Sequence, residues 1–238
     1  MSDDRLYFRH LLAGNDFANN DPVARQMVNL VYLIGDRSSG EAVAVDPAYE
    51  PGEILSLLAE DGMRLTGVLA THHHPDHVGG DLFGHAIMGI AELLELVDVP
   101  IHANKHEVEW IEATTGVARD GIVAHEGDDI VNVGEIGIRL LHTPGHTPGS
   151  QCFLVDGSLV AGDTLFLRGC GRTDFAGGDP AAMYDSLVNR LSKLPDDTIV
   201  HPGHLYSPEG SATLGETKAK NPVLKPRSAQ AWLSLFGG

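Results

Sequence analysis

Residues 71–80 read THHHPDHVGG. This segment begins at the last residue of a short apolar stretch, TGVLAT at 66–71. In an extended segment alternate side chains project to the same side, so His72 and His74 should face one position. A turn at the proline then brings Asp76 and His77 to a second position, while the intervening His73 is expected to point away. Imidazole and carboxylate together suit Zn²⁺, iron or Mn²⁺. The stretch therefore predicts a metal site at the end of a buried strand.

Three further candidate ligands lie downstream in segments rich in glycine and proline. They are His146 in HTPGHTPGS, Asp163 in AGDTLF and His204 in HPGHLYS. Glycine and proline favour tight turns, which can hold a side chain beyond the end of a strand. Functional side chains are often carried by such loops. We therefore expect these three residues to complete the metal site.

The remaining sequence alternates short apolar strands with helical patterns. Strands are expected at 26–34, 41–46, 66–71, 99–103 and 198–201, with several more between 130 and 162. Helices are expected at 51–62, 78–96, 104–116 and 180–193. Strands and helices interleaved in both halves predict an α/β (α+β) fold, with two mixed sheets packed face to face and helices outside. We expect this αββα sandwich to form a single domain over 1–238, with a short C-terminal tail from about residue 208.

The composition restricts the partners and the location. Acidic residues outnumber basic ones by 33 to 16, for a formal charge of −17. Nucleic acids and anionic membrane surfaces need clustered Lys and Arg, so neither is expected as a partner. No apolar run approaches the roughly 20 residues that span a bilayer, and the N-terminal MSDDRLYFRH has no apolar signal core. We expect a cytoplasmic protein, and the sequence does not indicate its oligomeric state.

The seven candidate ligands resemble the metallo-β-lactamase superfamily at every ligand position. The resemblance extends from QMVNLVYLI at 26–34 to the last of the ligands, and it implies the αββα sandwich and a two-metal site. The implied ligands are His72, His74 and His146 for the first metal, Asp76, His77 and His204 for the second, and Asp163 as a bridge between them.

A site of this kind predicts hydrolytic chemistry. Two neighbouring metals can share a water and lower its pKa toward about 7, and the resulting hydroxide attacks an electrophilic carbon. Asp76 is the candidate catalytic residue because it can orient that hydroxide. We expect two divalent transition metals, with Zn²⁺ favoured and iron or manganese as alternatives. No Ser or Cys nucleophile is required, so Cys170 in GCGR at 169–172 is interpreted as a packed residue beside the site.

The same THHHPDHVGG motif resembles glyoxalase II, the hydroxyacylglutathione hydrolases. That resemblance implies hydrolysis of a hydroxyacyl-glutathione-type thioester, and a small thiol ester of glutathione or a similar thiol as the partner. Arg172 stands where that family has a Lys near the glycine carboxylate of the substrate. Tyr206 matches its His-x-Tyr, whose hydroxyl contacts the glutathione backbone. These two are the candidate substrate-binding residues, although Asp174 stands where glyoxalase II has a Tyr.

Another segment of the chain resembles a second branch of the same superfamily. The stretch LFLRGCGRTDF at 165–175 resembles the persulfide dioxygenases, which hold one Fe(II) on a 2-His-1-carboxylate face. It implies iron binding by His72, His146 and Asp163 and oxidation of glutathione persulfide. A lactonase or another metallo-hydrolase is a further alternative. We favour the thioester hydrolase, because the front motif and the His-x-Tyr lie at the expected metal and thiol sites themselves.

Overall fold

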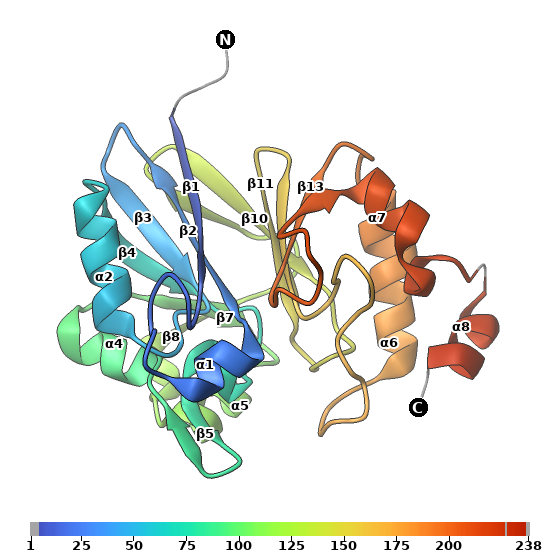
Figure 1. Cartoon of the computed structure of the whole chain (residues 1–238), viewed down its shortest axis with the longest axis horizontal. Coiled ribbons are helices and arrows are strands. Elements are labelled where there is room, and N and C mark those ends of the chain that lie inside the picture. The colour runs from blue at the N-terminus through green and yellow to red at the C-terminus, as the bar shows by residue number, and fades with distance from the viewer. Residues whose placement is uncertain (1–4, 227, 237–238) are drawn as a thin grey trace. The chain divides into compact units, whose positions relative to one another are not determined.

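The computed structural model describes residues 5–226 and 228–236 (Figure 1). The chain divides into two compact units. One comprises the chain up to His125 together with Ile130–Ile138, and the other comprises Glu126–Asp129 and the chain from Arg139 onward.

The first unit is built on a mixed sheet. Its strands lie in the order β1 (Leu6–Leu12), β2 (Leu30–Asp36), β3 (Glu41–Val45), β4 (Arg64–Leu69), β7 (Ile101–Asn104) and β8 (Ile122–His125). The first three strands pair antiparallel, and the pairs from β3 to β8 are parallel. The other elements are α1 (Pro22–Met27), α2 (Pro51–Glu60), α3 (Pro75–Val78), α4 (Ile90–Leu96), α5 (Val108–Thr115), a 3₁₀ turn (Arg119–Gly121) and the hairpin β5 (Gly80–Leu82) with β6 (His85–Ile87). Helix α2 contacts both β4 and α4.

A second sheet is also mixed. Its order is β14 (Ala212–Thr213), β13 (Ile199–Pro202), β12 (Ser158–Gly162), β11 (Gln151–Val155), β10 (Ile136–His142) and β9 (Ile130–Val133). Strands β12 and β13 are parallel, whereas the pairs β10–β11, β11–β12 and β13–β14 are antiparallel. The helices that follow are α6 (Pro180–Tyr184), which continues as a π-helical turn (Asp185–Arg190) and a 3₁₀ turn (Leu191–Lys193), then α7 (Leu214–Lys220), a 3₁₀ turn (Pro222–Leu224) and α8 (Ala229–Phe236).

These elements confirm the predicted fold class of mixed sheets with helices. The strands expected at 41–46 and 198–201 are β3 and β13, and the helices expected at 51–62 and 104–116 are α2 and α5. The segment 180–193 is helical throughout, as predicted.

The strand predicted at 26–34 is wrong over its first residues, because α1 extends to Met27 and β2 begins only at Leu30. Asp21 caps this helix by accepting hydrogen bonds from the backbone N–H groups of residues 23 and 24, at 2.7 and 3.1 Å. Pro22 occupies the first turn, where its missing N–H is not needed. Val28 then ends the helix in the left-handed conformation. The cap at Asp21 and the proline after it therefore favour a helix where the apolar pattern predicted a strand, and Asn29 lies between the end of α1 and the start of β2.

The helix predicted at 78–96 is also wrong in part. Helix α3 ends at Val78, the hairpin β5–β6 follows, and α4 begins only at Ile90. Gly79 and Gly80 have φ values of 88° and 126°, a backbone conformation that residues other than glycine rarely adopt. These two glycines therefore stop the helix directly after the metal-ligand motif.

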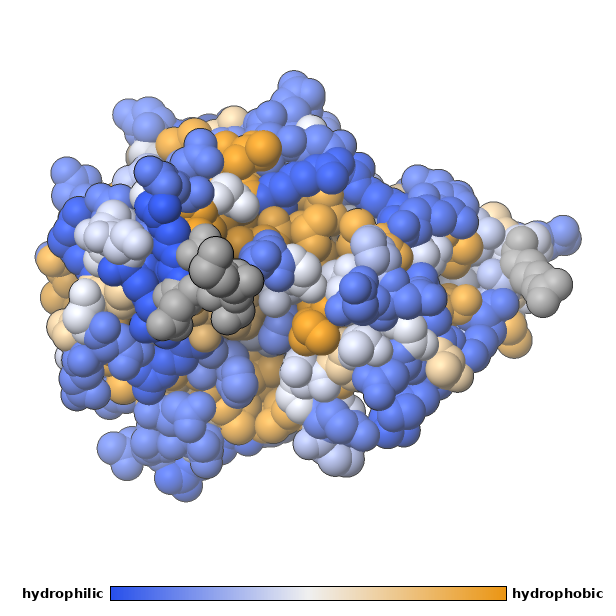
Figure 2. Space-filling view, turned by 90° about the horizontal axis from the view of Figure 1, so that it is seen from above, coloured by the Kyte–Doolittle hydropathy of each residue, from blue (hydrophilic) through white to orange (hydrophobic). Residues whose placement is uncertain are grey.

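Figure 2 shows hydrophilic side chains around the face in view, as expected for a chain with a formal charge of −17, and apolar side chains gathered toward its middle. Among the described residues, no helix is long and apolar enough to cross a membrane.

The segment expected as a short C-terminal tail carries β14, α7 and α8. Helix α8 is anchored by Trp232, which is fully buried and whose indole N–H donates to the carbonyl of Val223 at 2.9 Å. The indole belongs to the same core as Leu159, Met183 and Leu214. The segment after residue 208 thus packs into the hydrophobic core of the second unit.

Replacing Trp232 with Ala should lower the free energy of unfolding by about 3–5 kcal/mol, because it leaves a large cavity in that core. Urea denaturation followed by circular dichroism measures the loss. Leu235→Ala on the same helix is the matched control, since Leu235 is 68% exposed and should change stability by less than about 0.5 kcal/mol. Equal small losses in both variants would show that Trp232 does not anchor α8.

Candidate functional site

In the first unit, the predicted ligands lie where β4 leads into α3. His72 and His74 precede the helix, and Pro75 begins it at the position where a proline fits. Asp76 and His77 lie on α3 itself, and both are buried. One short segment thus supplies four ligand-type side chains from an extended stretch and from the single helical turn after it.

The rings of His72 and His74 meet edge to face at 82°, and His72 Nε2 lies 3.1 Å from His74 Nδ1. Two imidazole nitrogens at this distance either share a proton or face a common cation. The other nitrogen of His72, Nδ1, lies 2.9 Å from the hydroxyl of Thr71. When Nδ1–H donates to that hydroxyl, Nε2 is unprotonated, which is the form that binds a metal.

Asp46 follows β3 and orients two of these groups. Its Oδ2 lies 2.9 Å from His77 Nδ1 and accepts a hydrogen bond from the Thr71 hydroxyl at 2.6 Å, while Oδ1 accepts one from the Thr71 backbone N–H at 2.7 Å. Asp46, His72 and His77 form a group whose ligand-type atoms lie within 4.8 Å of one another. Because its oxygens already accept these hydrogen bonds, we interpret Asp46 as the residue that fixes His77, with Nε2 as the ligand atom of that histidine.

A second buried chain of hydrogen bonds orients Asp76. The hydroxyl of Tyr49 donates to Asn29 Oδ1 at 2.9 Å, and Asn29 Nδ2 donates to Asp76 Oδ2 at 3.1 Å. Asn29 and Tyr49 are 2% and 1% exposed. Because the amide oxygen of Asn29 accepts from Tyr49, its NH₂ group is directed at the Asp76 carboxylate and fixes the orientation of that side chain.

His73 has partners outside the predicted ligand set, although its ring also meets that of His74 edge to face at a centroid distance of 4.9 Å. Its Nδ1 lies 2.6 Å from the fully buried Glu107 carboxylate, and its ring stacks on Trp110 with a centroid distance of 4.8 Å. These contacts tie the ligand-bearing segment to α5 and the residue before it.

In the second unit, His146, Asp163 and His204 come together, and all three are buried. Asp163 follows β12 and His204 follows the parallel strand β13, so both lie at the same edge of the sheet. Asp163 Oδ2 lies 3.7 Å from His146 Nε2 and 3.3 Å from His204 Nε2. One carboxylate oxygen therefore faces two imidazole nitrogens, as a bridging ligand would.

His146 is fixed in the same way as the histidines of the first unit. Its Nδ1 lies 2.7 Å from the backbone carbonyl of Arg172, so Nδ1 carries the proton and Nε2 is the candidate ligand atom. Gly171 permits this approach, because a Cβ there would lie 2.2 Å from the carbonyl oxygen of Asp163 and 2.8 Å from His146 Nδ1. The GCGR stretch therefore serves the histidine through its backbone.

The two predicted substrate-binding residues are both exposed. Arg172 donates from Nε and Nη2 to Asp174 at 2.9 and 2.6 Å, and its guanidinium lies 4.4 Å from the centre of the Phe175 ring. This ion pair raises the pKa of Arg172 and lowers that of Asp174. Tyr206 stacks on His204 with a centroid distance of 4.7 Å and an interplanar angle of 5°. Tyr206 thus lies directly against a candidate ligand.

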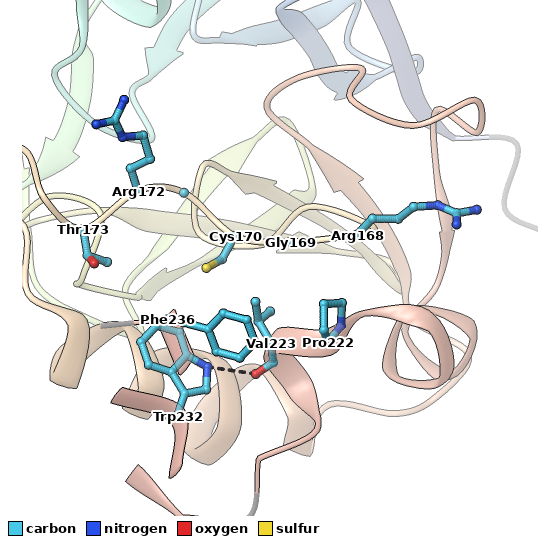
Figure 3. A pocket seen from close by; sticks show the side chains of 10 residues that line it. Arg168, Gly169, Cys170, Arg172, Thr173, Pro222, Val223, Trp232 and Phe236 are labelled. Atoms are coloured by element: carbon cyan, nitrogen blue, oxygen red, sulfur yellow. Dashed lines mark hydrogen bonds between the residues drawn. The ribbon is translucent and has the colours of Figure 1, made fainter. Parts of the chain in front are cut away.

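Cys170 lines a cavity of about 320 Å³ in the second unit. Figure 3 shows its side chain directed toward Trp232 and Phe236, on the opposite wall. Burial raises the pKa of this thiol to about 12, so it is protonated at neutral pH and a poor nucleophile. That state agrees with its interpretation as a packed residue.

Sequence reasoning missed Asp46, Asn29 and Tyr49. Asp46 had a usable signal, since it ends a buried strand as Asp163 does. Asn29 stands within an apolar run, which also marks it. Tyr49 had no such signal, because only the fold brings its hydroxyl to the amide.

The imidazole and carboxylate donors of both units fit divalent transition metals such as Zn²⁺ or iron. Each predicted ligand lies in one of the two groups, with His72, His74, Asp76 and His77 in the first unit and His146, Asp163 and His204 in the second.

Known proteins match the chain along most of its length. The family model described as Metallo-beta-lactamase superfamily matches residues 25–204. A hydroxyacylglutathione hydrolase from Rhodopseudomonas palustris (strain BisB18) is 36% identical over 204 residues, which are 85% of this chain and 72% of that protein. ETHE1 from Myxococcus xanthus superposes with a TM-score of 0.78 and 30% identity, over 98% of this chain and 90% of that one. TTHA1623, in a di-iron-bound form, has a TM-score of 0.68 and 31% identity, over 83% and 96%.

Asp46→Asn should weaken Zn²⁺ binding about 10- to 100-fold, because the amide has only one acceptor oxygen, whereas the Asp46 carboxylate accepts on Oδ2 from His77 and the Thr71 hydroxyl and on Oδ1 from the Thr71 backbone N–H. Competition with a chromophoric chelator measures the affinity, and circular dichroism checks that the variant is folded. Asp98→Asn, at an exposed position of the same unit, should leave it unchanged. A folded Asp46→Asn protein with undiminished affinity would show that Asp46 does not orient a ligand.

Proposed function

The chain belongs to the metallo-β-lactamase superfamily, and from that premise we propose that it is a thioester hydrolase acting on a hydroxyacyl-glutathione-type substrate. The observation that carries the proposal is the Asp163 carboxylate, one oxygen of which faces two imidazole nitrogens at 3.3 and 3.7 Å. A carboxylate so placed suits a ligand shared by two metals. The relative named hydroxyacylglutathione hydrolase supports the substrate class.

The proposed ligands follow the family pattern and serve one two-metal centre. Zn²⁺ is the first choice for both positions, and iron is the alternative that the di-iron-bound TTHA1623 supports. The first metal is assigned to His72, His74 and His146, the second to Asp76, His77 and His204, and the bridge to Asp163.

Two divalent metals, when bound, lower the pKa of a shared water toward about 7 and polarise a carbonyl oxygen. The protein contributes the orientation of the groups around them. Asp76, held by the Asn29 amide, is proposed to orient the attacking water. The hydrogen bonds at Nδ1 of His77 and His146 leave Nε2 of each ring as the proposed ligand atom. In the net reaction, water adds to the thioester carbon and the C–S bond breaks, giving a carboxylic acid and a free thiol.

Arg172 and Tyr206 are proposed to contact the thiol portion of the substrate. Asp174 engages Nε and Nη2 of Arg172, so Nη1 is the donor proposed to bind a substrate carboxylate. Such a local cation is needed because the chain as a whole has a formal charge of −17. Tyr206 presents an exposed ring beside His204.

Persulfide oxidation is the second candidate, and a specific observation favours it. Asp174 occupies the place of the glyoxalase II Tyr and pairs with Arg172, within the LFLRGCGRTDF stretch that resembles the persulfide dioxygenases. ETHE1 also matches nearly the whole chain. In that case one Fe(II) would be held by His72, His146 and Asp163. A lactonase is a further alternative.

Loading the apoprotein separately with Zn²⁺ and with Fe²⁺ tests the choice. Each form is assayed for loss of S-D-lactoylglutathione and for oxygen uptake with glutathione persulfide. We expect the zinc form to hydrolyse the thioester without oxygen uptake. Rapid oxygen uptake confined to the iron form, with negligible thioester loss in either form, would replace the hydrolase with the dioxygenase.

Asp76→Asn should lower kcat for thioester hydrolysis about 10²- to 10⁴-fold, the range for loss of a positioned acid–base group.

A further inference from the structure

A small cavity lies beside His204 in the second unit. It has a volume of about 130 Å³, which corresponds to about four water molecules. Tyr206 stacks on His204, and Phe166 meets both rings edge-on at centroid distances of 5.2 and 6.0 Å. Arg168 is the cationic residue of its lining, which consists of Phe166, Leu167, Arg168, Gly169, His204, Tyr206 and Ser207. The cavity therefore suits one small anionic group rather than a whole thiol ester.

A buried amide fixes the backbone on both sides of Arg168. Asn221 is fully buried, and its Nδ2 donates to the carbonyls of Phe166 and Gly169 at 2.8 and 3.0 Å. The N–H of Phe166 also donates to the carbonyl of Gly169 at 3.0 Å. Asn221 Oδ1 is held in turn by the N–H of Val223 at 3.1 Å. The Arg168 side chain thus extends from a turn whose backbone is held by the Asn221 amide.

Arg168 is more weakly engaged than Arg172. Its ion pair with Glu209 is a single contact of 3.4 Å between side chains that are 52% and 45% exposed, and exposed pairs of this kind are weak. Arg172 by contrast makes two shorter hydrogen bonds to Asp174. Figure 3 shows the two guanidinium groups on one segment, extending in different directions and away from Trp232. An arriving carboxylate can therefore displace Glu209 more easily than it can displace Asp174.

We propose that Arg168 binds a carboxylate of the thiol portion of the substrate in this cavity and so selects anionic thiols over neutral ones. The proposal rests on the proposed function and adds a recognition residue to Arg172 and Tyr206. The planar guanidinium matches a carboxylate in two-pronged geometry. A chain with a formal charge of −17 repels anions in general, so selectivity for them depends on such local cations.

Arg168→Gln tests the proposal with two thioesters, S-D-lactoylglutathione and the uncharged S-lactoyl-N-acetylcysteamine. We expect KM for the glutathione ester to rise about 10- to 100-fold, the range for loss of a charged hydrogen bond, with little change in kcat. Kinetics with the uncharged ester should not change. Glu209→Gln is the matched control, because it removes the same ion pair and keeps the arginine, and it should not weaken the glutathione ester.

Binding of the inert ligand S-methylglutathione, measured by calorimetry, gives a readout that does not depend on turnover. Arg168→Gln should weaken this binding by a similar factor. If the wild-type protein neither binds S-methylglutathione nor hydrolyses the ester, the proposed function itself fails. If the wild type does both and Arg168→Gln is unaffected, or if Glu209→Gln is equally impaired, the role of Arg168 is refuted while the hydrolase stands.

Discussion

A histidine binds a metal only through an unprotonated nitrogen, and this chain fixes that state with hydrogen bonds at the opposite side of the ring. Nδ1 is held by the Thr71 hydroxyl in His72, by the Asp46 carboxylate in His77 and by a backbone carbonyl in His146. Three different partners, in two units, thus impose one tautomer. Gly171 serves the same constraint, because a Cβ at that position would lie 2.8 Å from His146 Nδ1.

The candidate ligands could be identified from the sequence because they lie at the ends of apolar strands, in one dense motif and three short loops. The groups that orient them were not, because they are distant in sequence. Asp46 is 31 residues from His77, and Asn29 is 47 residues from Asp76. A polar residue at the end of a strand can be read from the sequence, but its partner across such a separation depends on how the strands are ordered in the sheet.

The errors in the predicted elements have local causes. Apolar periodicity predicted a strand at 26–34, but the Asp21 cap and Pro22 start a helix that reaches Met27. The same reasoning predicted one helix over 78–96, but two glycines with positive φ divide it. In both places backbone conformation overrides the pattern of apolar side chains. The candidate ligands Asp76 and His77 lie on α3, directly before the two glycines that end this helix.

The segment 165–175 combines two roles that the sequence could not separate. Its backbone holds His146 through the Arg172 carbonyl, and its side chains carry the charges proposed to recognise the substrate. Asn221, from the segment expected to be a tail, fixes the turn around Arg168. In the proposed function, substrate recognition and metal binding are therefore linked within the second unit through the segment 165–175.

The proposal that most needs a test is that the seven candidate ligands bind two metals. Anomalous diffraction from crystals of the zinc-loaded protein measures this directly. We expect two zinc peaks per chain, about 3.5–4 Å apart as in other two-metal sites, with the Asp163 carboxylate between them. A single peak in fully loaded crystals, or two peaks far from each other, would contradict it.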